Sequence, residues 1–264
     1  FDIRMSKKIQ LYLFCFLCLG ATLHAQVKNT KPNILIILTD DQGYHDVSYY
    51  GTKDIRTPNI DALCNAGMRF DYFYSNSPVC SPTRASLMSG KYPDLVGVPG
   101  LVRSTPDNTW GYLQPGTILL PQQLKQAGYH TAHIGKYHVG GHGTDKTMPE
   151  NQGFDINIGG YSQGHQPTCF SKKIKEGWKF AKLGQGDFDR FGAPYSQSYI
   201  EKYAIPKSQI GKPKHVCDAL ADAMEETIGK LSAKDNPFYL QLHAYAVHGP
   251  VQSRPDLKAT ALKN

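Results

Sequence analysis

The chain has 264 residues, of which 40% are hydrophobic, 11% aromatic and 19% charged, and its formal net charge at pH 7 is +7. This composition excludes an intrinsically disordered chain and predicts a globular protein with a sizeable core. The excess of positive charge is mild, and it suits either an anionic ligand or simply a soluble basic protein. No cluster of Lys and Arg is interleaved with aromatic residues, so we expect no nucleic acid partner.

The first 25 residues have the pattern of an export signal. Basic residues precede an apolar run from Ile9 to Gly20, and small residues up to Ala25 offer a cleavage site. The apolar run is short for a membrane span, so we expect no anchor after cleavage. We therefore predict upstream residues and a signal peptide over residues 1–25, and an exported chain, periplasmic or secreted, over residues 26–264.

The next elements predict the first strand and helix of a domain. Asn33 to Leu38 is a continuous apolar run, which indicates a central strand covered by helices on both faces. Thr57 and Pro58 favour the start of a helix that ends at Gly67. We expect an aromatic strand to follow, from Phe70 to Tyr74.

Further along the chain, helical and strand patterns alternate. We predict helices over residues 117–128 and 215–233, and strands over residues 131–135 and 238–246. Residues 140–213 are rich in Gly, Pro, Tyr and Lys, and we expect them to form long loops that shape a ligand pocket. The fold class predicted is α/β, with a largely parallel central sheet flanked by helices.

Cys80-Ser81-Pro82-Thr83-Arg84 combines a thiol, a proline and a fixed positive charge. The locked φ of Pro82 suits the first turn of a helix that runs to Gly90, so Cys80 lies at its N-terminus. The helix dipole favours negative charge there, and Arg84 lies about one turn further on. The segment therefore suits a bound anion, although a structural cysteine beside a surface arginine is an alternative interpretation of the same sequence.

Charged residues also follow the predicted strands. Ligands gather at the carboxyl ends of the strands in open α/β sheets, which draws attention to Asp40 and Asp41 after the first strand. Two adjacent carboxylates repel each other unless a cation neutralises them, and Ca²⁺ prefers such hard oxygen ligands. A solvated acidic turn is the alternative.

Two further strand ends carry groups that can bind anions. Lys136 and His138 follow the strand at 131–135 and lie on the same side of an extended segment, so both could reach one anion. His248 follows the strand at 238–246. A single histidine is more often structural, but its position at the end of a strand favours a functional role for His248.

These motifs together resemble the type I sulfatase family, which has an alkaline phosphatase-like fold. Cys80 to Arg84 is similar to the family signature Cys-x-Pro-x-Arg, with Ser89 where threonine is usual, and Val247 to Pro250 is similar to Ala-Pro-His-x-Pro, with Val247 in place of proline. The resemblance extends over roughly residues 31–250. It implies a sulfuric ester hydrolase that acts on a sulfated carbohydrate or on an aryl or alkyl sulfate.

The resemblance assigns roles to the residues at the strand ends. It implies that a formylglycine-generating or anaerobic sulfatase-maturating enzyme converts Cys80 to formylglycine, the source of the nucleophile. One Ca²⁺ would be held by Asp40, Asp41 and residue 80, next to Arg84.

The resemblance also implies contacts with the substrate. Lys136, His138 and His248 would contact the sulfate and the leaving group, with His248 a candidate proton donor. Ser162 would bind substrate, and His165 would contribute to specificity.

The family places further metal ligands and a small C-terminal domain beyond position 264, so we expect residues 26–264 to be a partial catalytic domain. Two alternatives stay open at this point. The chain could be a phosphoester or phosphonate hydrolase of the same superfamily, or an inactive anion- or glycan-binding fragment.

Four cysteines follow the predicted signal peptide: Cys64, Cys80, Cys169 and Cys217. An oxidising compartment would permit a disulfide, and the sequence leaves the pairing open. If Cys80 is converted to an aldehyde, at least one of the other three stays unpaired.

Overall fold

The computed structural model describes residues 31–103, 111–140, 147–166, 168–180 and 187–261. The chain divides into two compact units, Phe1–Pro32 and Asn33–Asn264, and every element below belongs to the second. The predicted signal peptide lies outside the described residues. Across the ranges given above, no helix is both long and apolar enough to cross a membrane.

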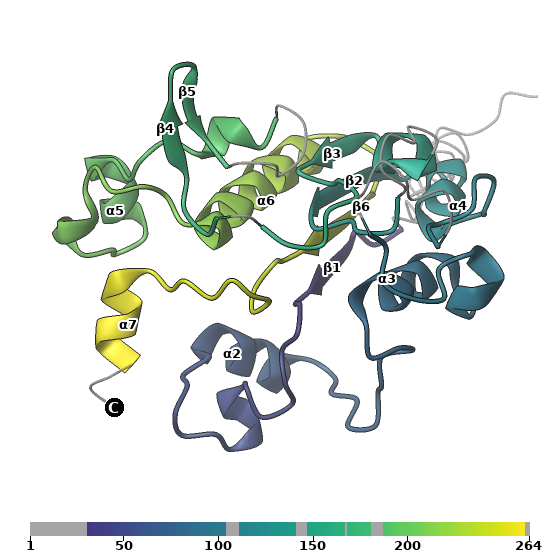
Figure 1. The fold of residues 1–264 in the computed structure, drawn as a ribbon, viewed down its shortest axis with the longest axis horizontal. Coiled ribbons are helices and arrows are strands. Elements are labelled where there is room, and N and C mark those ends of the chain that lie inside the picture. The colour runs from purple at the N-terminus through teal and green to yellow at the C-terminus, as the bar shows by residue number, and fades with distance from the viewer. Residues whose placement is uncertain (1–30, 104–110, 141–146, 167, 181–186, 262–264) are drawn as a thin grey trace, which may run out of the picture. The chain divides into compact units, whose positions relative to one another are not determined.

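A four-stranded parallel sheet forms the centre of the second unit (Figure 1). Its strands lie in the order β1 (Ile34–Leu38), β6 (Phe238–His243), β2 (His130–Gly135) and β3 (Ile156–Ile158). All neighbouring pairs are parallel, and Leu38 and Gly135 are both level with His243. The carboxyl ends of β1, β6 and β2 therefore meet at one edge. The predicted α/β class with a parallel central sheet is confirmed.

Helices pack on both faces of this sheet. On one face, α6 (Val216–Ser232) buries Leu220 and Ala223 against Leu240 and Leu242 of β6. The side chains of a strand alternate between its faces, so Tyr239 points to the other side, where it packs with α3 (Cys80–Ser89) and α4 (Leu120–Gln126). The predicted helix over 215–233 is confirmed to within a residue at each end.

The remaining elements surround this core. They are α2 (Pro58–Ala66), α5 (Gln197–Lys202) and α7 (Pro255–Ala261), an antiparallel hairpin of β4 (Lys172–Ile174) and β5 (Gly177–Lys179), and 3₁₀ turns at Ser48–Tyr50, Pro93–Val96, Pro149–Gln152, Asp189–Phe191 and Lys207–Gln209.

The prediction that the first strand is covered on both faces is wrong. Strand β1 is an edge strand of the described sheet, and α6 packs mainly against β2 and β6. The side chains of Leu35 and Ile37 are consequently 43% and 54% exposed. An apolar run predicts that a strand forms, whereas the burial of each face of the strand depends on where distant helices pack.

Two other predictions also need correction. Phe70 to Tyr74 forms a loop with a turn, not a strand, and its aromatic side chains are exposed. It pairs with no strand in the described part of the chain. Residues 140–213 are not only loops. They contain the edge strand β3, the β4–β5 hairpin and α5.

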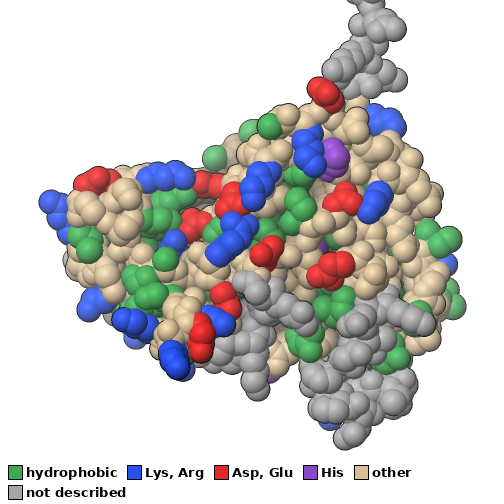
Figure 2. Space-filling view, turned by 90° about the horizontal axis from the view of Figure 1, so that it is seen from above, with side chains coloured by type: hydrophobic (Ala, Val, Ile, Leu, Met, Phe, Trp, Pro, Cys, Tyr) green, Lys and Arg blue, Asp and Glu red, His purple; other side chains and the backbone are tan. Residues whose placement is uncertain are grey.

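The face shown in Figure 2 carries charges of both signs. Lys and Arg side chains are interspersed with Asp and Glu there and do not gather into one patch. This face therefore offers no field of a single sign to attract a charged ligand from a distance.

Candidate functional site

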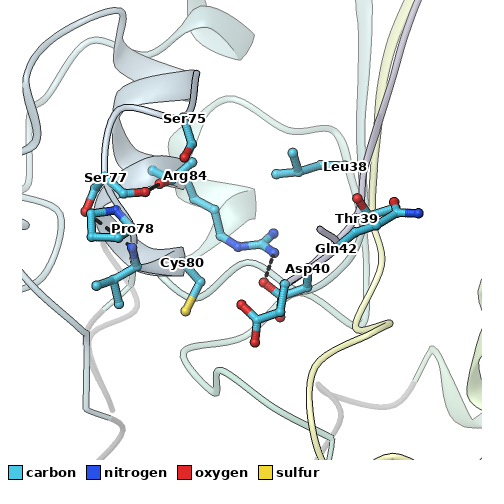
Figure 3. A pocket seen from close by; sticks show the side chains of 12 residues that line it. Leu38, Thr39, Asp40, Gln42, Ser75, Ser77, Pro78, Cys80 and Arg84 are labelled. Atoms are coloured by element: carbon cyan, nitrogen blue, oxygen red, sulfur yellow. Dashed lines mark hydrogen bonds and ion pairs between the residues drawn. The ribbon is translucent and has the colours of Figure 1, made fainter. Parts of the chain in front are cut away.

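A cavity of about 230 Å³ lies at the carboxyl end of β1, where the chain leaves the sheet (Figure 3). Asp40 and Asp41 line one side, and the start of α3 lines the other with Cys80 and Arg84. The strand-end positions singled out in the sequence therefore meet in one place, as parallel strands dictate.

Helix α3 presents Cys80 at its first residue. Val79 is extended, with φ −123° and ψ 145°, and Cys80 begins the helix. Gly90 ends it in the left-handed region at φ 68°, and its N–H donates to the Ser86 carbonyl over 2.8 Å. The helix predicted up to Gly90 is thus present, and its first turn points the thiol into the cavity.

The carboxylate of Asp40 is buried between two cations. One oxygen accepts a hydrogen bond from Arg84 Nη2 over 3.1 Å, and the other lies 2.5 Å from Lys136 Nζ. Figure 3 shows the Arg84 guanidinium pointing at this carboxylate. A carboxylate that is only 4% exposed requires such partners, since an unpaired buried charge is costly.

The three buried groups together carry one net positive charge. Burial lowers the pKa of the Arg84 guanidinium, and the neighbouring Asp40 carboxylate opposes this effect. Arg84 Nη1 also donates to the backbone carbonyl of Lys136 over 3.0 Å, while Arg84 Nε is buried without a hydrogen-bond partner among the described residues. The cavity floor therefore suits an anion.

His138 lies beside the thiol of Cys80. Its Nδ1 is 3.2 Å from Cys80 Sγ, and its Nε2 is 2.9 Å from the carbonyl oxygen of Val102. Because a carbonyl oxygen only accepts, Nε2 carries the proton and the Nδ1 lone pair faces the thiol. Burial, with a further contribution from Lys136, lowers the pKa of His138 to about 3, which keeps this lone pair available.

The segment that carries Lys136 and His138 is not extended, in contrast to the sequence prediction. Gly135 ends β2 at φ 89°, where an added Cβ would lie 2.2 Å from the carbonyl oxygen of His243. His138 also adopts a left-handed φ of 57°. These turns send the ammonium to Asp40 and the imidazole to Cys80.

The candidate residues Asp41, His165 and His248 lie at the mouth of the site. His248 Nε2 is 3.9 Å from Asp41 Oδ2, and the two side chains are 31% and 62% exposed. The exposed ring of His165 stacks on His248 with a centroid distance of 6.3 Å. Ser162, by contrast, is completely buried. The structure thus forms two groups of candidate residues. The inner site consists of Asp40, Cys80, Arg84, Lys136 and His138, and the outer residues at its exposed mouth are Asp41, His165 and His248.

Comparison with known proteins identifies the family of this chain. Residues 32–263 match the family model named Sulfatase. The chain belongs to the sulfatase family. A sulfatase of Formosa agariphila is 32% identical to it over 97% of this chain and 52% of the relative. The N-acetylgalactosamine-6-sulfatase of Sus scrofa is 40% identical over 83% of this chain and 40% of the relative.

Solved structures show the same relationship. The crystal structure of Ps i-CgsB in complex with k-i-k-neocarrahexaose superposes with a TM-score of 0.68 and 28% identity, over 89% of this chain and 49% of that one. BT4656 in complex with D-glucosamine-2-N,6-O-disulfate gives a TM-score of 0.53 and 25% identity, over 86% and 37%. The chain spans about half the length of the curated sulfatases that it matches.

Two of the predicted calcium ligands, Asp40 and Asp41, lie in this site, although both oxygens of Asp40 already pair with Arg84 and Lys136. The hard oxygens of Asp40 and Asp41 are donors that Ca²⁺ prefers, and both residues line the cavity. In the part of the chain that the structure describes, however, no three His, Cys, Asp or Glu side chains form a metal-binding group. Since Ca²⁺ takes roughly six to eight ligands, these two carboxylates would form one side of its coordination shell.

Sequence reasoning missed the groups that hold His138 in place. The backbone carbonyls of Val102 and Tyr161 accept from its Nε2 and its N–H, over 2.9 and 3.0 Å. The imidazole also packs on Gly164, where an added Cβ would lie 2.1 Å from His138 Cε1. Contacts made by backbone carbonyls cannot be recognised from residue types, and nothing in the sequence distinguishes Gly164 from the other glycines among the 25 in the chain.

Gly164→Ala should therefore lower the free energy of unfolding by about 1–3 kcal/mol, because the methyl group must displace the buried ring of His138. The matched control is Gly229→Ala on the exposed side of α6, where an added Cβ meets nothing within 4 Å. This control should raise stability by about 0.5–1 kcal/mol, because alanine favours helix. Urea unfolding measures both; equal effects of the two variants would contradict the packing described for His138.

A buried polar layer lies beneath the site. His133 Nδ1 is 3.4 Å from Gln241 Oε1, and the His133 ring meets that of His243 edge-on with a centroid distance of 5.1 Å. Burial lowers the pKa of His133 from 6.5 to about 4. His133 is therefore neutral in the folded protein at pH values where the unfolded chain already binds a proton.

This difference predicts a loss of stability in acid. As the pH falls from about 6.5 towards about 4, only the unfolded chain gains the proton on His133, which favours unfolding. Between about pH 8 and about pH 5, the wild type should lose about 2 kcal/mol more than His133→Asn. The control Ile134→Val, on the same strand, should lower stability equally at both pH values. An identical pH dependence of wild type and His133→Asn in urea unfolding would refute the assignment.

Proposed function

We propose that this sulfatase-family chain is the N-terminal part of an enzyme that hydrolyses a sulfate ester on a saccharide, with its nucleophile at position 80. The observation that carries the proposal is the Cys80 thiol facing the free lone pair of His138, above a buried group with one net positive charge. A sulfate is an anion that such a cavity would attract. The saccharides bound in two of the related structures suggest the rest of the substrate.

The residues of the inner site divide the chemical work. His138 Nδ1 accepts a hydrogen bond from the group at position 80 and so holds that group in a fixed orientation. Arg84 contributes a charge that does not titrate and that Asp40 holds in a fixed orientation. Lys136, fully buried and paired with Asp40, adds a second positive charge beneath the cavity, which would help to stabilise the negative charge that develops on the sulfate.

The outer residues suit the alcohol side of the ester. His248 stands at the mouth beside Asp41, where it can donate a proton to the oxygen of the departing alcohol. The stacked ring of His165 offers a flat surface to a sugar, and we assign it to substrate recognition. Ser162, the other residue predicted to bind substrate, is completely buried.

The proposal includes two groups supplied from outside the sequence. A maturation enzyme would convert Cys80 to formylglycine, whose hydrated aldehyde carries two hydroxyls on one carbon, one to attack sulfur and one to expel the sulfate afterwards. Calcium bound by Asp40, Asp41 and residue 80 would supply positive charge against a sulfate oxygen. The mature chain would act in the periplasm or outside the cell, after loss of the signal peptide.

The test is release of sulfate by protein produced together with a formylglycine-generating enzyme. We would assay this chain alone and a fusion that carries the C-terminal half of the Formosa agariphila relative, on sulfated saccharides and on matched phosphate esters. Release of sulfate that requires Cys80 supports the proposal. Faster hydrolysis of the phosphate esters, or binding of saccharide without turnover by both proteins, would overturn it.

A further inference from the structure

Cys169 and Cys217 lie on two segments that hydrogen bonds hold side by side. Phe170 and His215 form an isolated antiparallel bridge. On either side of it, the Val216 N–H donates to the Cys169 carbonyl over 2.7 Å, and the Ser171 N–H donates to the Lys214 carbonyl over 2.9 Å. This register brings the backbone of Cys169 to the residue next to Cys217.

The two side chains also share one environment. Both line a cavity of about 480 Å³ and both pack in the core beneath α6, where Cys169 is 3% exposed. Burial raises the pKa of the Cys217 thiol to about 12, and negative charge on Asp218 and on Cys169 adds to the effect.

The other two cysteines have different partners. Cys80 faces His138 in the inner site. Cys64 lies on α2, where it interacts with Tyr50. Cys169 and Cys217, by contrast, line the same cavity.

We propose that Cys169 and Cys217 form a disulfide bond in the exported protein. Each thiol loses a proton, and the pair gives two electrons to a disulfide oxidant, such as oxidised glutathione or a thiol–disulfide oxidoreductase, which leaves as two thiols. The bond would anchor the segment after His165 to the first turn of α6, beside the cavity that His248 lines. It closes a long loop, which is the condition under which a disulfide restricts the unfolded chain most.

The experiment uses the full chain, equilibrated with reduced or oxidised glutathione. Remaining thiols are trapped with maleimide, and the protein is digested without reduction and analysed by mass spectrometry. We expect a linked pair of peptides containing Cys169 and Cys217, and a melting temperature roughly 5–15 °C above that of the reduced protein. Cys64→Ser should keep both results, whereas Cys169→Ser and Cys217→Ser should lose them.

Two results would overturn the proposal: maleimide on both Cys169 and Cys217 under oxidising conditions, or a disulfide that contains Cys64. The peptide map of the wild type decides this even if a serine variant fails to fold. Because the readout does not involve the Cys80 peptide, the result is independent of whether the proposed sulfatase activity is correct.

Discussion

Cys80→Ser should lower the rate of sustained sulfate release by roughly 10³-fold or more, even with the formylglycine-generating enzyme present. A serine at this position has a single hydroxyl. It could accept a sulfate once, but it has no second hydroxyl on the same carbon to expel it. We therefore expect at most one ester cleaved per protein molecule, with the alcohol released and the sulfate retained on a stable sulfated serine that mass spectrometry detects.

Two controls accompany this experiment. Cys64→Ser removes a thiol on α2, outside the cavity, and should retain wild-type turnover. Cys80→Ala should lose even the first transfer, because it has no nucleophile. Multiple turnover by Cys80→Ser would rule out the proposed role of position 80.

Asp40→Asn should lower the free energy of unfolding by about 3–5 kcal/mol, because it leaves Arg84 and Lys136 buried without a compensating negative charge. Urea unfolding in the presence of a calcium chelator measures this loss without any contribution from bound metal.

The matched control is the adjacent carboxylate. Asp41 has a side chain that is 62% exposed, so Asp41→Asn should change stability by no more than about 0.5 kcal/mol. The difference in unfolding free energy between Asp40→Asn and Asp41→Asn tests the burial of Asp40 directly. Similar stabilities of the two variants would show that Asp40 is not the counter-ion of both cations.

Much of the fold followed from local patterns. The helical spacing over 215–233 and the signals around Pro82 and Gly90 identified α6 and α3. In a parallel sheet, the carboxyl ends of strands lie together, so the residues after β1 and β2 could be placed at one site before their contacts were known.

What the sequence could not predict depends on distant parts of the chain. The exposure of Ile37 reflects the position of α6, which packs mainly against β2 and β6. Phe70 to Tyr74 has strand-forming residues but pairs with no strand in the described part of the chain. The tautomer of His138 is set by a backbone carbonyl 36 residues away, which no residue type reveals.

The most direct test of the central claim is the mass of the peptide that contains Cys80, after production with a formylglycine-generating enzyme and with an aldehyde-reactive probe as confirmation. Our account predicts an aldehyde at position 80 in place of the thiol. An unmodified thiol, under conditions that convert a known sulfatase produced in parallel, would contradict it.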